Sequence, residues 1–472
     1  MRAHPAGPRH GEILAPPGAP SRPSSTTEAL ALDPTIWPLT AARSASGALT
    51  VGGLPVADIV AQYGTPVFVL DEADFVSRAR GFRQAFQAAE PRADVYYAGK
   101  AFLTTTIARW LTAEQLAIDV CTGGELACAL RAGVPGDNLL FHGNNKSVGE
   151  IERGVAAGVG IFVVDSFEEI DRVATAAAAT GRVQRVLIRL TTGVEAHTHE
   201  FIATAHEDQK FGFSLASGMA DAAVERVLSH PSLALHGLHS HIGSQIFDLA
   251  GFEVAAHRVA EYAAHLQKDF GVAVELLDLG GGMGIAYTTG DDPIGVDEMA
   301  EQLRAIVSRV CAEEGLPVPR LAIEPGRAIV GPSAITVYEV GTVKDVDLGG
   351  GHWRRYVSVD GGMSDNIRTA LYDAEYTVTL ANRSSDSDTA LSRIVGKHCE
   401  SGDIVVRDCW LPADLQPGDL LAVAATGAYC RAMASQYNYV PRPGVIAVKD
   451  GSHSVILRRE TEDDLFATDP GA

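Results

Sequence analysis

The feature that most constrains the fold is an alternation of short β-branched runs with longer Ala-rich amphipathic stretches between residues 67 and 326. Connecting segments such as 75–89 and 149–157 have the apolar spacing of helices. Strands that alternate with helices predict a parallel sheet with right-handed crossovers, in a doubly wound sheet or in a closed (β/α)8 TIM-type barrel. If VFVLD only leads into the fold, eight units remain, which favours the barrel. The runs are VFVLD (67–71), DVYYAGK (94–100), LAIDVC (116–121), NLLFHG (138–143), GIFVVDS (160–166), RVLIRLT (185–191), LHGLHSHIG (235–243), LLDLGGG (276–282) and RLAIEPG (320–326).

The residue pattern before and after these units differs from the alternation within them, and a chain of 472 residues is long enough for a second domain. Residues 1–35 are rich in Pro, Ala, Gly and Ser and are expected to be a disordered extension. After residue 330, strand-like runs separated by turns predict a mostly antiparallel β domain. We therefore expect a leading segment (36–65) that packs with the β domain, a barrel (66–330), the β domain (331–460) and a tail (461–472).

Composition excludes several classes of partner. The net charge of −21 argues against nucleic acid or an anionic membrane surface. No apolar run reaches the length of about 18 residues that a membrane span needs, and the N-terminus has no apolar core of a secretory signal. The six cysteines are scattered and form no C-x-x-C pair, which is typical of reduced thiols in a cytoplasmic protein.

Polar residues and glycines gather where the expected strands end. In a barrel these ends all face one mouth, where active sites are built. The coincidence of eight such ends, more than any one residue, indicates a catalytic site. The positions are Lys100, Cys121–Gly124, His142–Asn145, Asp165-Ser166, Arg189, His239 and His241, Gly280–Gly282 and Glu324–Arg327.

Three of these strand ends have a structural and a functional interpretation each. Lys100 ends an apolar strand in a chain with few lysines, so it is either a solvated strand end or a desolvated amine suited to imine formation. Gly280-Gly281-Gly282 is either a flexible turn or a loop whose backbone N–H groups approach a phosphate. Glu324 and Arg327 are either a buried structural pair or ligands of a cofactor and a carboxylate.

His239 and His241 lie two residues apart on one expected strand, so both imidazoles face the same side. They could be metal ligands, or one could stack on a flat cofactor ring while Ser244 donates to its phosphate. A metal site would need further histidines and a carboxylate at the later strand ends. Those ends carry Gly-Gly-Gly and Glu-Pro-Gly-Arg instead, which favours the cofactor and predicts no metal ligand.

The motifs YAGKA, HIGSQ, DLGGG, EPGR, CESGD and GAYC, in this order, resemble the decarboxylase branch of the alanine-racemase-like fold type of pyridoxal phosphate (PLP) enzymes. Within it the chain is most similar to the diaminopimelate decarboxylase family. The segments HGNNKS (142–147), MSDNIRTALYDAEY (363–376), VGKHCESGD (395–403) and GAYCRAMASQYN (427–438) carry that similarity, as does 197–214. The resemblance covers about 55–455. The chain departs from the family pattern at Cys121-Thr122, where a small residue is expected.

The resemblance implies a role for each residue of the cofactor site. Lys100 would carry PLP as a Schiff base, His241 would stack on its ring, and Glu324 would pair with its pyridine nitrogen. Ser244 and the three glycines would hold the phosphate, and Tyr429 would close the site near it. The implied cofactor-binding set is Lys100, His241, Ser244, Gly280, Gly281, Gly282, Glu324, Pro325, Gly326, Arg327 and Tyr429.

The resemblance also implies decarboxylation of meso-2,6-diaminopimelate to L-lysine, the last step of lysine biosynthesis. Arg327, Arg368 and Tyr372 would hold the distal carboxylate of the substrate, with Tyr429 nearby, and Glu400 would meet its distal ammonium. Cys399 would be the proton donor and, with Lys100 and His241, would complete the catalytic set. Cys399 and Glu400 would come from the partner subunit, which implies a homodimer with shared active sites.

Three alternatives remain open. A related PLP decarboxylase could act on ornithine, arginine or a carboxylated polyamine, although these lack the second amino-acid head that Arg368, Tyr372 and Glu400 would bind. A metal-dependent barrel hydrolase could use His239 and His241. An inactive homologue could bind PLP without catalysis, although the joint presence of Lys100, Cys399 and Glu324 argues against it.

Overall fold

The computed structural model describes residues 21–193, 210–349 and 352–472. The chain forms two compact units, each described here by itself. Unit 1 comprises residues 1–75, 285–292 and 329–472, and unit 2 comprises residues 76–284 and 293–328. The expected segment 197–214 falls largely outside the described residues.

Unit 2 is a closed barrel of eight parallel strands. The strands follow the order β5-β6-β7-β8-β9-β11-β12-β13, and β13 pairs with β5 to close the ring. The barrel is therefore confirmed over the doubly wound alternative, because an open sheet has two unpaired edges. The barrel strands are β5 (Asp94–Ala98), β6 (Ala117–Val120), β7 (Leu139–Phe141), β8 (Ile161–Val164), β9 (Gln184–Thr191), β11 (Leu233–His239), β12 (Leu276–Asp278) and β13 (Arg320–Ile323), and β10 (Phe213–Ser214) pairs outside with β9.

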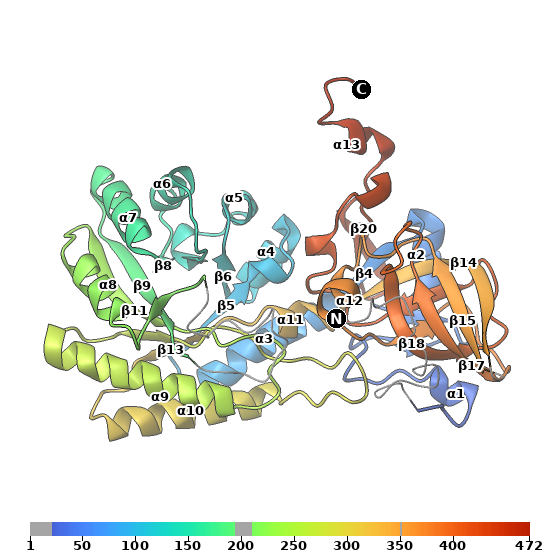
Figure 1. Ribbon diagram of the computed structural model, residues 1–472, viewed down its shortest axis with the longest axis horizontal. Helices are drawn as coiled ribbons and strands as arrows, with labels where there is room; N and C mark the ends of the chain where they lie inside the picture. Colours follow the sequence, from blue (N-terminus) through green and yellow to red (C-terminus); the bar gives the residue numbers. More distant parts are fainter. Residues whose placement is uncertain (1–20, 194–209, 350–351) are drawn as a thin grey trace. The chain divides into compact units, whose positions relative to one another are not determined.

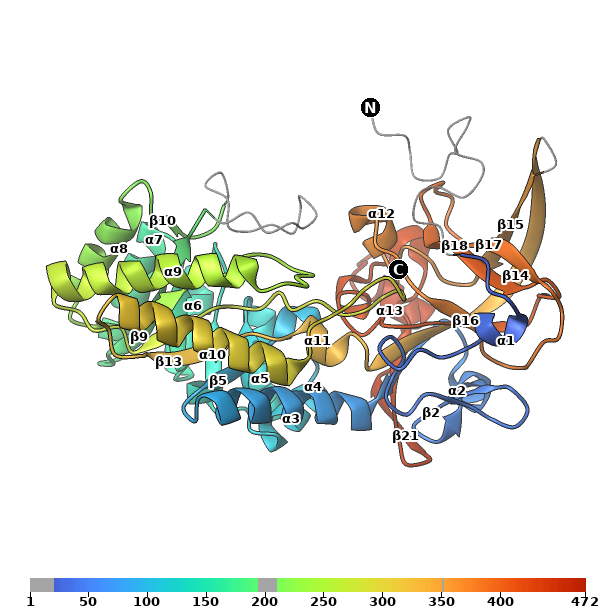
Figure 2. The same ribbon diagram turned by 90° about the horizontal axis from the view of Figure 1, so that it is seen from below.

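Helices cover the outside of the barrel (Figure 1). Figure 2 shows the long helices α9 and α10 side by side along one face. The barrel interior is filled by apolar side chains from several strands, including Tyr96, Leu140, Leu187 and Leu276. The helices are α3 (Glu72–Ala89), α4 (Thr105–Ala113), α5 (Gly123–Ala132), α6 (Val148–Ala156), α7 (Phe167–Ala179), α8 (Met219–Leu228), α9 (Ala250–His265), α10 (Val296–Glu313) and α11 (Arg327–Val330).

Hydroxyl side chains start four consecutive barrel helices shortly after the strands end. Thr104, Thr122, Ser147 and Ser166 each accept a hydrogen bond from the backbone N–H three residues later. These N-caps satisfy N–H groups that a helix leaves unpaired at its start. Because the helices begin so early, the loops are short and the strand ends stay at the barrel mouth.

Unit 1 is built on a mixed, mostly antiparallel sheet in the order β18-β17-β15-β14-β4-β20-β21, with β19 joining β14 to β16. Its core includes Trp37, Val69, Ile335 and Ile446. The strands of the sheet are β4 (Val67–Asp71), β14 (Ala334–Gly349), β15 (His352–Val359), β16 (Val378–Leu380), β17 (Thr389–Val395), β18 (Ile404–Pro412), β19 (Leu420–Val423), β20 (Gly444–Lys449) and β21 (Ser452–Leu457), and the helices that follow are α12 (Arg368–Tyr372) and α13 (Glu462–Phe466).

Strand β4 corrects the expected start of the barrel at residue 66. It pairs antiparallel with β14 and parallel with β20, so the VFVLD run belongs to unit 1. All five of its residues are buried, as they would be in a barrel strand. Its burial pattern therefore could not reveal which sheet it joins.

The start of the chain also differs from the expectation of disorder to residue 35. Residues 26–29 form helix α1 (Thr26–Ala29), whose first turn is capped by Ser25, and Leu30 is buried. The capped turn and the buried Leu30 anchor this stretch to unit 1. Residues 1–20 lie outside the described residues. Residues 36–65 then form β1 (Ala42–Arg43), β2 (Leu49–Val51), β3 (Leu54–Pro55) and α2 (Val56–Tyr63).

Among the residues with described positions, no helix combines the length and the apolar character that crossing a membrane requires. All six cysteines are free thiols.

Candidate active site

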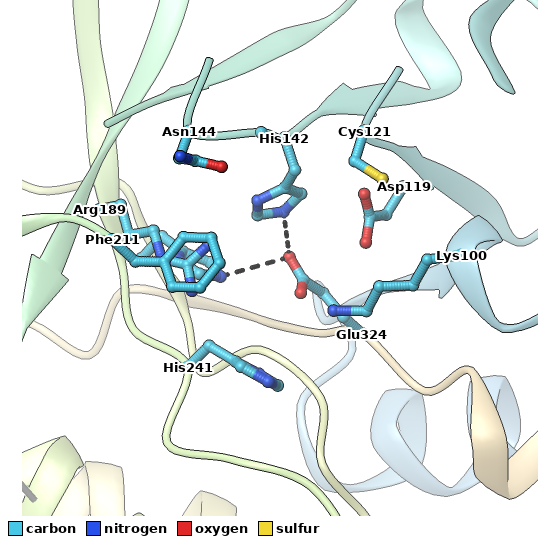
Figure 3. Close-up of a pocket in the computed structure, with 11 residues that line it drawn as sticks. Lys100, Asp119, Cys121, His142, Asn144, Arg189, Phe211, His241 and Glu324 are labelled. Atoms are coloured by element: carbon cyan, nitrogen blue, oxygen red, sulfur yellow. Dashed lines mark hydrogen bonds and ion pairs between the residues drawn. The ribbon is translucent and has the colours of Figure 1, made fainter. Parts of the chain in front are cut away.

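A cavity of about 270 Å³ opens at the carboxyl ends of the barrel strands. Strands β5, β6, β7, β9, β11 and β13 all contribute to it, and Figure 3 shows the side chains of Lys100, His142 and Glu324 directed into the same space. The shared mouth expected from the sequence is thus present, and Lys100, His241 and Glu324 meet there. The lining residues are Lys100, Asp119, Cys121, His142, Gly143, Asn144, Arg189, Phe211, His239, His241 and Glu324.

Lys100 lies in the 3-10 turn Gly99–Ala101 directly after β5. The turn packs against the Glu-Pro-Gly-Arg segment, because the Ala98 N–H donates to the Pro325 carbonyl at 3.2 Å. A side chain on Gly326 would come within 2.9 Å of the Ala98 Cβ, so glycine permits this close approach. The Lys100 side chain is exposed, so the desolvated amine considered from the sequence is not what this structure shows.

Glu324 is held at the end of β13 by two histidines from other strands. Its Oε1 lies 2.5 Å from His142 Nε2 and 3.5 Å from His239 Nε2, and the two imidazole rings meet edge to face. All three side chains are buried. Although burial alone would raise it, the pKa of Glu324 is held well below its usual range by His142 and His239.

Two other carboxyl groups near Glu324, those of Asp119 and Asp278, behave oppositely. Burial, together with the charge of Glu324, raises the pKa of Asp119 to about 7 and that of Asp278 well above its usual range. Environments that push neighbouring pKa values apart assign different charge states to the groups. Of these three carboxyl groups, Glu324 is therefore the one held most firmly in its charged form.

His241 and the glycine triplet form one unit. The Gly281 N–H donates to His241 Nδ1 at 3.2 Å, and burial, with the nearby cations Lys100 and Arg189, lowers the pKa of His241 well below its usual value. The ring is thus neutral. A Cβ at Gly280 (φ +71°) would approach His241 Nδ1 to 2.8 Å, and one at Gly281 would approach the Glu324 carbonyl oxygen to 2.3 Å. Only glycines allow backbone this close to both groups.

Ser244 and Arg327 are also brought together, because Arg327 Nη2 donates to Ser244 Oγ at 2.9 Å. Arg327 is the first residue of α11, and its side chain is buried. A guanidinium beside a hydroxyl can bind one anionic oxygen group through both partners.

These residues fit a phosphorylated pyridine cofactor. The cavity offers an amine for covalent attachment, a neutral imidazole, a charged carboxylate for a protonated ring nitrogen, and a glycine loop without side chains. His239 Nδ1 and Ser240 Oγ are buried and make no hydrogen bond within the described residues, which is unusual for polar atoms in a protein core.

The same buried trio of His142, His239 and Glu324 has donor atoms within 4.8 Å of one another and could also coordinate a metal ion. The metal interpretation considered from the sequence used His239 with His241. In the structure His241 instead accepts from the glycine loop, and His142 takes its place in the trio.

Five expected site residues belong to unit 1. Arg368 and Tyr372 are the first and last residues of α12, and Tyr429 has a left-handed backbone with φ of 60°. Arg368 is buried, with 4% of its surface exposed, and forms no ion pair with an acidic side chain of the described residues. Cys399 and Glu400 lie in the turn between β17 and β18, and both are exposed.

Sequence reasoning assigned no role to several residues of the cavity. His142 and Arg189 were expected at the barrel mouth as polar strand ends, but nothing local showed that His142 contacts Glu324. Asp119 lies inside a short apolar run, where its inward position on β6 was the available signal. Phe211, whose ring stacks on the Arg189 guanidinium at 4.3 Å, had no signal.

Comparison with known proteins points to the same cofactor. A family model described as pyridoxal-dependent decarboxylase, pyridoxal binding domain, matches residues 72–331. The diaminopimelate decarboxylase of Mycobacterium leprae is 55% identical over 471 residues, covering 99% of both chains. That of Bacillus subtilis is 42% identical over 430 residues, covering 91% of this chain and 97% of the relative.

Solved structures lead to the same family. A diaminopimelate decarboxylase from M. jannaschi superposes with a TM-score of 0.83 at 29% identity, covering 91% of this chain and 97% of that one. One from Helicobacter pylori, complexed with L-lysine, has a TM-score of 0.78 at 30% identity and covers 87% and 98%. By sequence over nearly its full length and by fold, the chain belongs to the diaminopimelate decarboxylase family of pyridoxal-dependent decarboxylases.

Proposed function

We infer that this chain is a carbon–carbon lyase that uses PLP to decarboxylate meso-2,6-diaminopimelate to L-lysine and CO2, the final step of lysine biosynthesis. Its relatives carry that activity in their names, and one relative was solved with L-lysine bound. The observation in this molecule that carries the inference is the meeting of Lys100, His241 and the charged Glu324 in one cavity.

The chain's own residues prepare the site for this chemistry. When bound, PLP supplies the electron sink for the pair left behind by CO2. We propose that Lys100 Nζ holds the cofactor covalently and that Glu324 keeps its ring nitrogen protonated. The neutral His241 imidazole would lie against the ring, and the glycine loop with Ser244 would hold the phosphate. Tyr429 would close the site near the phosphate.

The second amino-acid head of the substrate needs a cation for its carboxylate and an anion for its ammonium. We propose that Arg368 takes the carboxylate, with Arg327 and Tyr372, and that Glu400 takes the ammonium. The burial of Arg368 without an acidic partner supports this role, because a buried guanidinium is normally paired.

The carbon that loses CO2 must then receive a proton, and we propose that Cys399 Sγ delivers it. We further propose that the protein is a cytoplasmic homodimer in which Cys399 and Glu400 serve the partner's site. Their exposure on the β17–β18 turn supports this arrangement, since neither is enclosed by its own chain.

The direct test measures CO2 release from meso-diaminopimelate, ornithine and arginine by the purified protein. We expect release from meso-diaminopimelate alone, and borohydride reduction should fix the cofactor mass to the peptide that contains Lys100. In Lys100→Ala both signals should vanish, while Lys344→Ala, an exposed lysine of β14, should keep both.

Activity that survives in Lys100→Ala would remove Lys100 as the attachment point. Preferential release from ornithine or arginine would favour the related decarboxylases. Purified protein that holds zinc and no PLP would support the metal interpretation of His142, His239 and Glu324 instead.

A further inference from the structure

The surroundings of Arg368 are unusual for a buried cation. Its Nη1 donates to the hydroxyl of Tyr376 at 2.6 Å, and its guanidinium carbon lies 4.9 Å from the ring centre of Tyr287 and 5.7 Å from that of Tyr376. The two rings meet edge to face with centroids 5.1 Å apart. Both tyrosines are buried, with 5% and 4% of their surfaces exposed. We refer to Tyr287 and Tyr376 as the tyrosine cage.

The tyrosine cage stabilises the guanidinium without neutralising it. Aromatic faces attract a cation through their quadrupole, and a phenol oxygen accepts one hydrogen bond, but neither carries a charge. Burial, which dominates over the opposing effect of Arg368, raises the pKa of Tyr376 well above its usual value, so the phenol keeps its proton. Among the described residues, therefore, no acidic side chain compensates the positive charge of Arg368.

The hydroxyl of Tyr376 contacts a second polar group besides Arg368. Its oxygen accepts from Arg368, and Cys430 Sγ lies 3.6 Å away. Tyr376 thus holds Arg368 from one side and is itself held from the other. An aspartate or glutamate in its place would occupy the guanidinium fork with a permanent carboxylate.

We propose that Tyr287 and Tyr376 are positioning residues that determine specificity: they hold Arg368 oriented and electrically uncompensated, so that the cation is paired only by a carboxylate of the ligand. This inference rests on the proposed function, in which Arg368 binds the distal carboxylate of the substrate. It extends that function to two residues that shape selection between ligands with and without this carboxylate.

The test compares wild type with Tyr376→Phe, which keeps the ring and removes only the hydroxyl. We expect the KM for meso-diaminopimelate to rise about tenfold, equivalent to about 1.4 kcal/mol, with kcat and PLP content unchanged. L-lysine keeps the distal carboxylate, whereas cadaverine lacks it. Inhibition by L-lysine should therefore weaken by the same factor, and inhibition by cadaverine should not change.

Two further variants separate positioning from a general loss of structure. Tyr262→Phe removes the hydroxyl of another buried tyrosine, on α9, and should leave every constant at the wild-type value. Tyr287→Leu removes a ring that faces the guanidinium and should raise the KM, whereas Tyr287→Phe restores the ring and should restore the KM. If Tyr376→Phe does not fold, the comparison of Tyr287→Leu with Tyr287→Phe still tests the inference.

The outcomes distinguish a failure of the proposed function from a failure of the inference about the tyrosine cage. Wild-type protein that releases no CO2 from meso-diaminopimelate, or an Arg368→Ala variant with an unchanged KM, would overturn the proposed function and this inference with it. An active wild type with a sensitive Arg368, but an unchanged KM in Tyr376→Phe and Tyr287→Leu, would overturn the inference alone. A fall in kcat with constant KM would also overturn it, because the tyrosines would then act in the chemistry.

Discussion

Replacement of Gly281 by alanine tests how tightly the glycine loop and the Glu324 turn are packed together. The added Cβ would lie 2.3 Å from the Glu324 carbonyl oxygen and 3.2 Å from its carbonyl carbon. Since real Cβ atoms essentially never come within 3.0 Å of another heavy atom, the two segments must separate by at least about 0.7 Å. The contact is with backbone, so no rotamer change can relieve it.

The separation would act on groups that hold the site. The Glu324 N–H donates to the Gly280 carbonyl at 2.9 Å, and the Gly281 N–H donates to His241 Nδ1 at 3.2 Å. Weakening both bonds, at about 1 kcal/mol each, and displacing the carboxylate from His142 gives a total of about 2–3 kcal/mol. If this cost falls on cofactor binding, the Kd for PLP should rise about 30- to 150-fold.

The assay is titration of cofactor-depleted protein with PLP, in which binding is monitored by the quenching of intrinsic fluorescence. Gly149→Ala is the matched control, because a Cβ on this exposed residue in the first turn of α6 meets nothing within 4 Å. We expect the control to bind PLP like the wild type. A Kd for Gly281→Ala within about threefold of the control would refute the reasoning, since the close approach would then impose no constraint on the site.

Two other predictions concern stability. Lys146 and Glu169 form a buried ion pair, so Lys146→Met should lower the free energy of unfolding in urea by about 3–5 kcal/mol. As the control, Arg80→Met removes one partner of a largely exposed pair with Glu114 and should lower it by less than about 1 kcal/mol. Equal losses in the two variants would contradict the role of burial. Burial lowers the pKa of His239 to about 4. Below about pH 6.5, His239 is therefore protonated in the unfolded chain but stays neutral in the folded protein. The free energy of unfolding should fall by up to about 1.4 kcal/mol for each pH unit that the pH is lowered in this range. Asp119, with a pKa raised to about 7, changes the free energy of unfolding with pH in the opposite direction over this range. The measurement is therefore the free energy of unfolding against pH, from about pH 4.5 to about 7, and the slope is compared between wild type and His239→Asn. Parallel curves for the two proteins would refute the assignment of that slope to His239.

Local pattern in the sequence was enough to predict the barrel and the ends of its strands. Period and length distinguish a strand from a helix within a few residues, and parallel strands must place their carboxyl ends together. Lys100, the glycine triplet and Glu324 could therefore be assigned to one mouth before any contact was known. The order of the motifs then indicated the family, and the comparisons confirm it.

Only the tertiary structure decided which partners these elements and side chains have. The VFVLD run is buried on both faces in either sheet, so periodicity could not assign it to unit 1. His142 reaches Glu324 across 182 residues of sequence, and Arg368 meets Tyr287 from a segment of unit 1 that interrupts the barrel sequence. The charge on Glu324 and the uncompensated cation of Arg368 both follow from such distant neighbours. Local sequence sets backbone geometry, but charge states depend on burial and on charges nearby in space, which only the folded chain brings together.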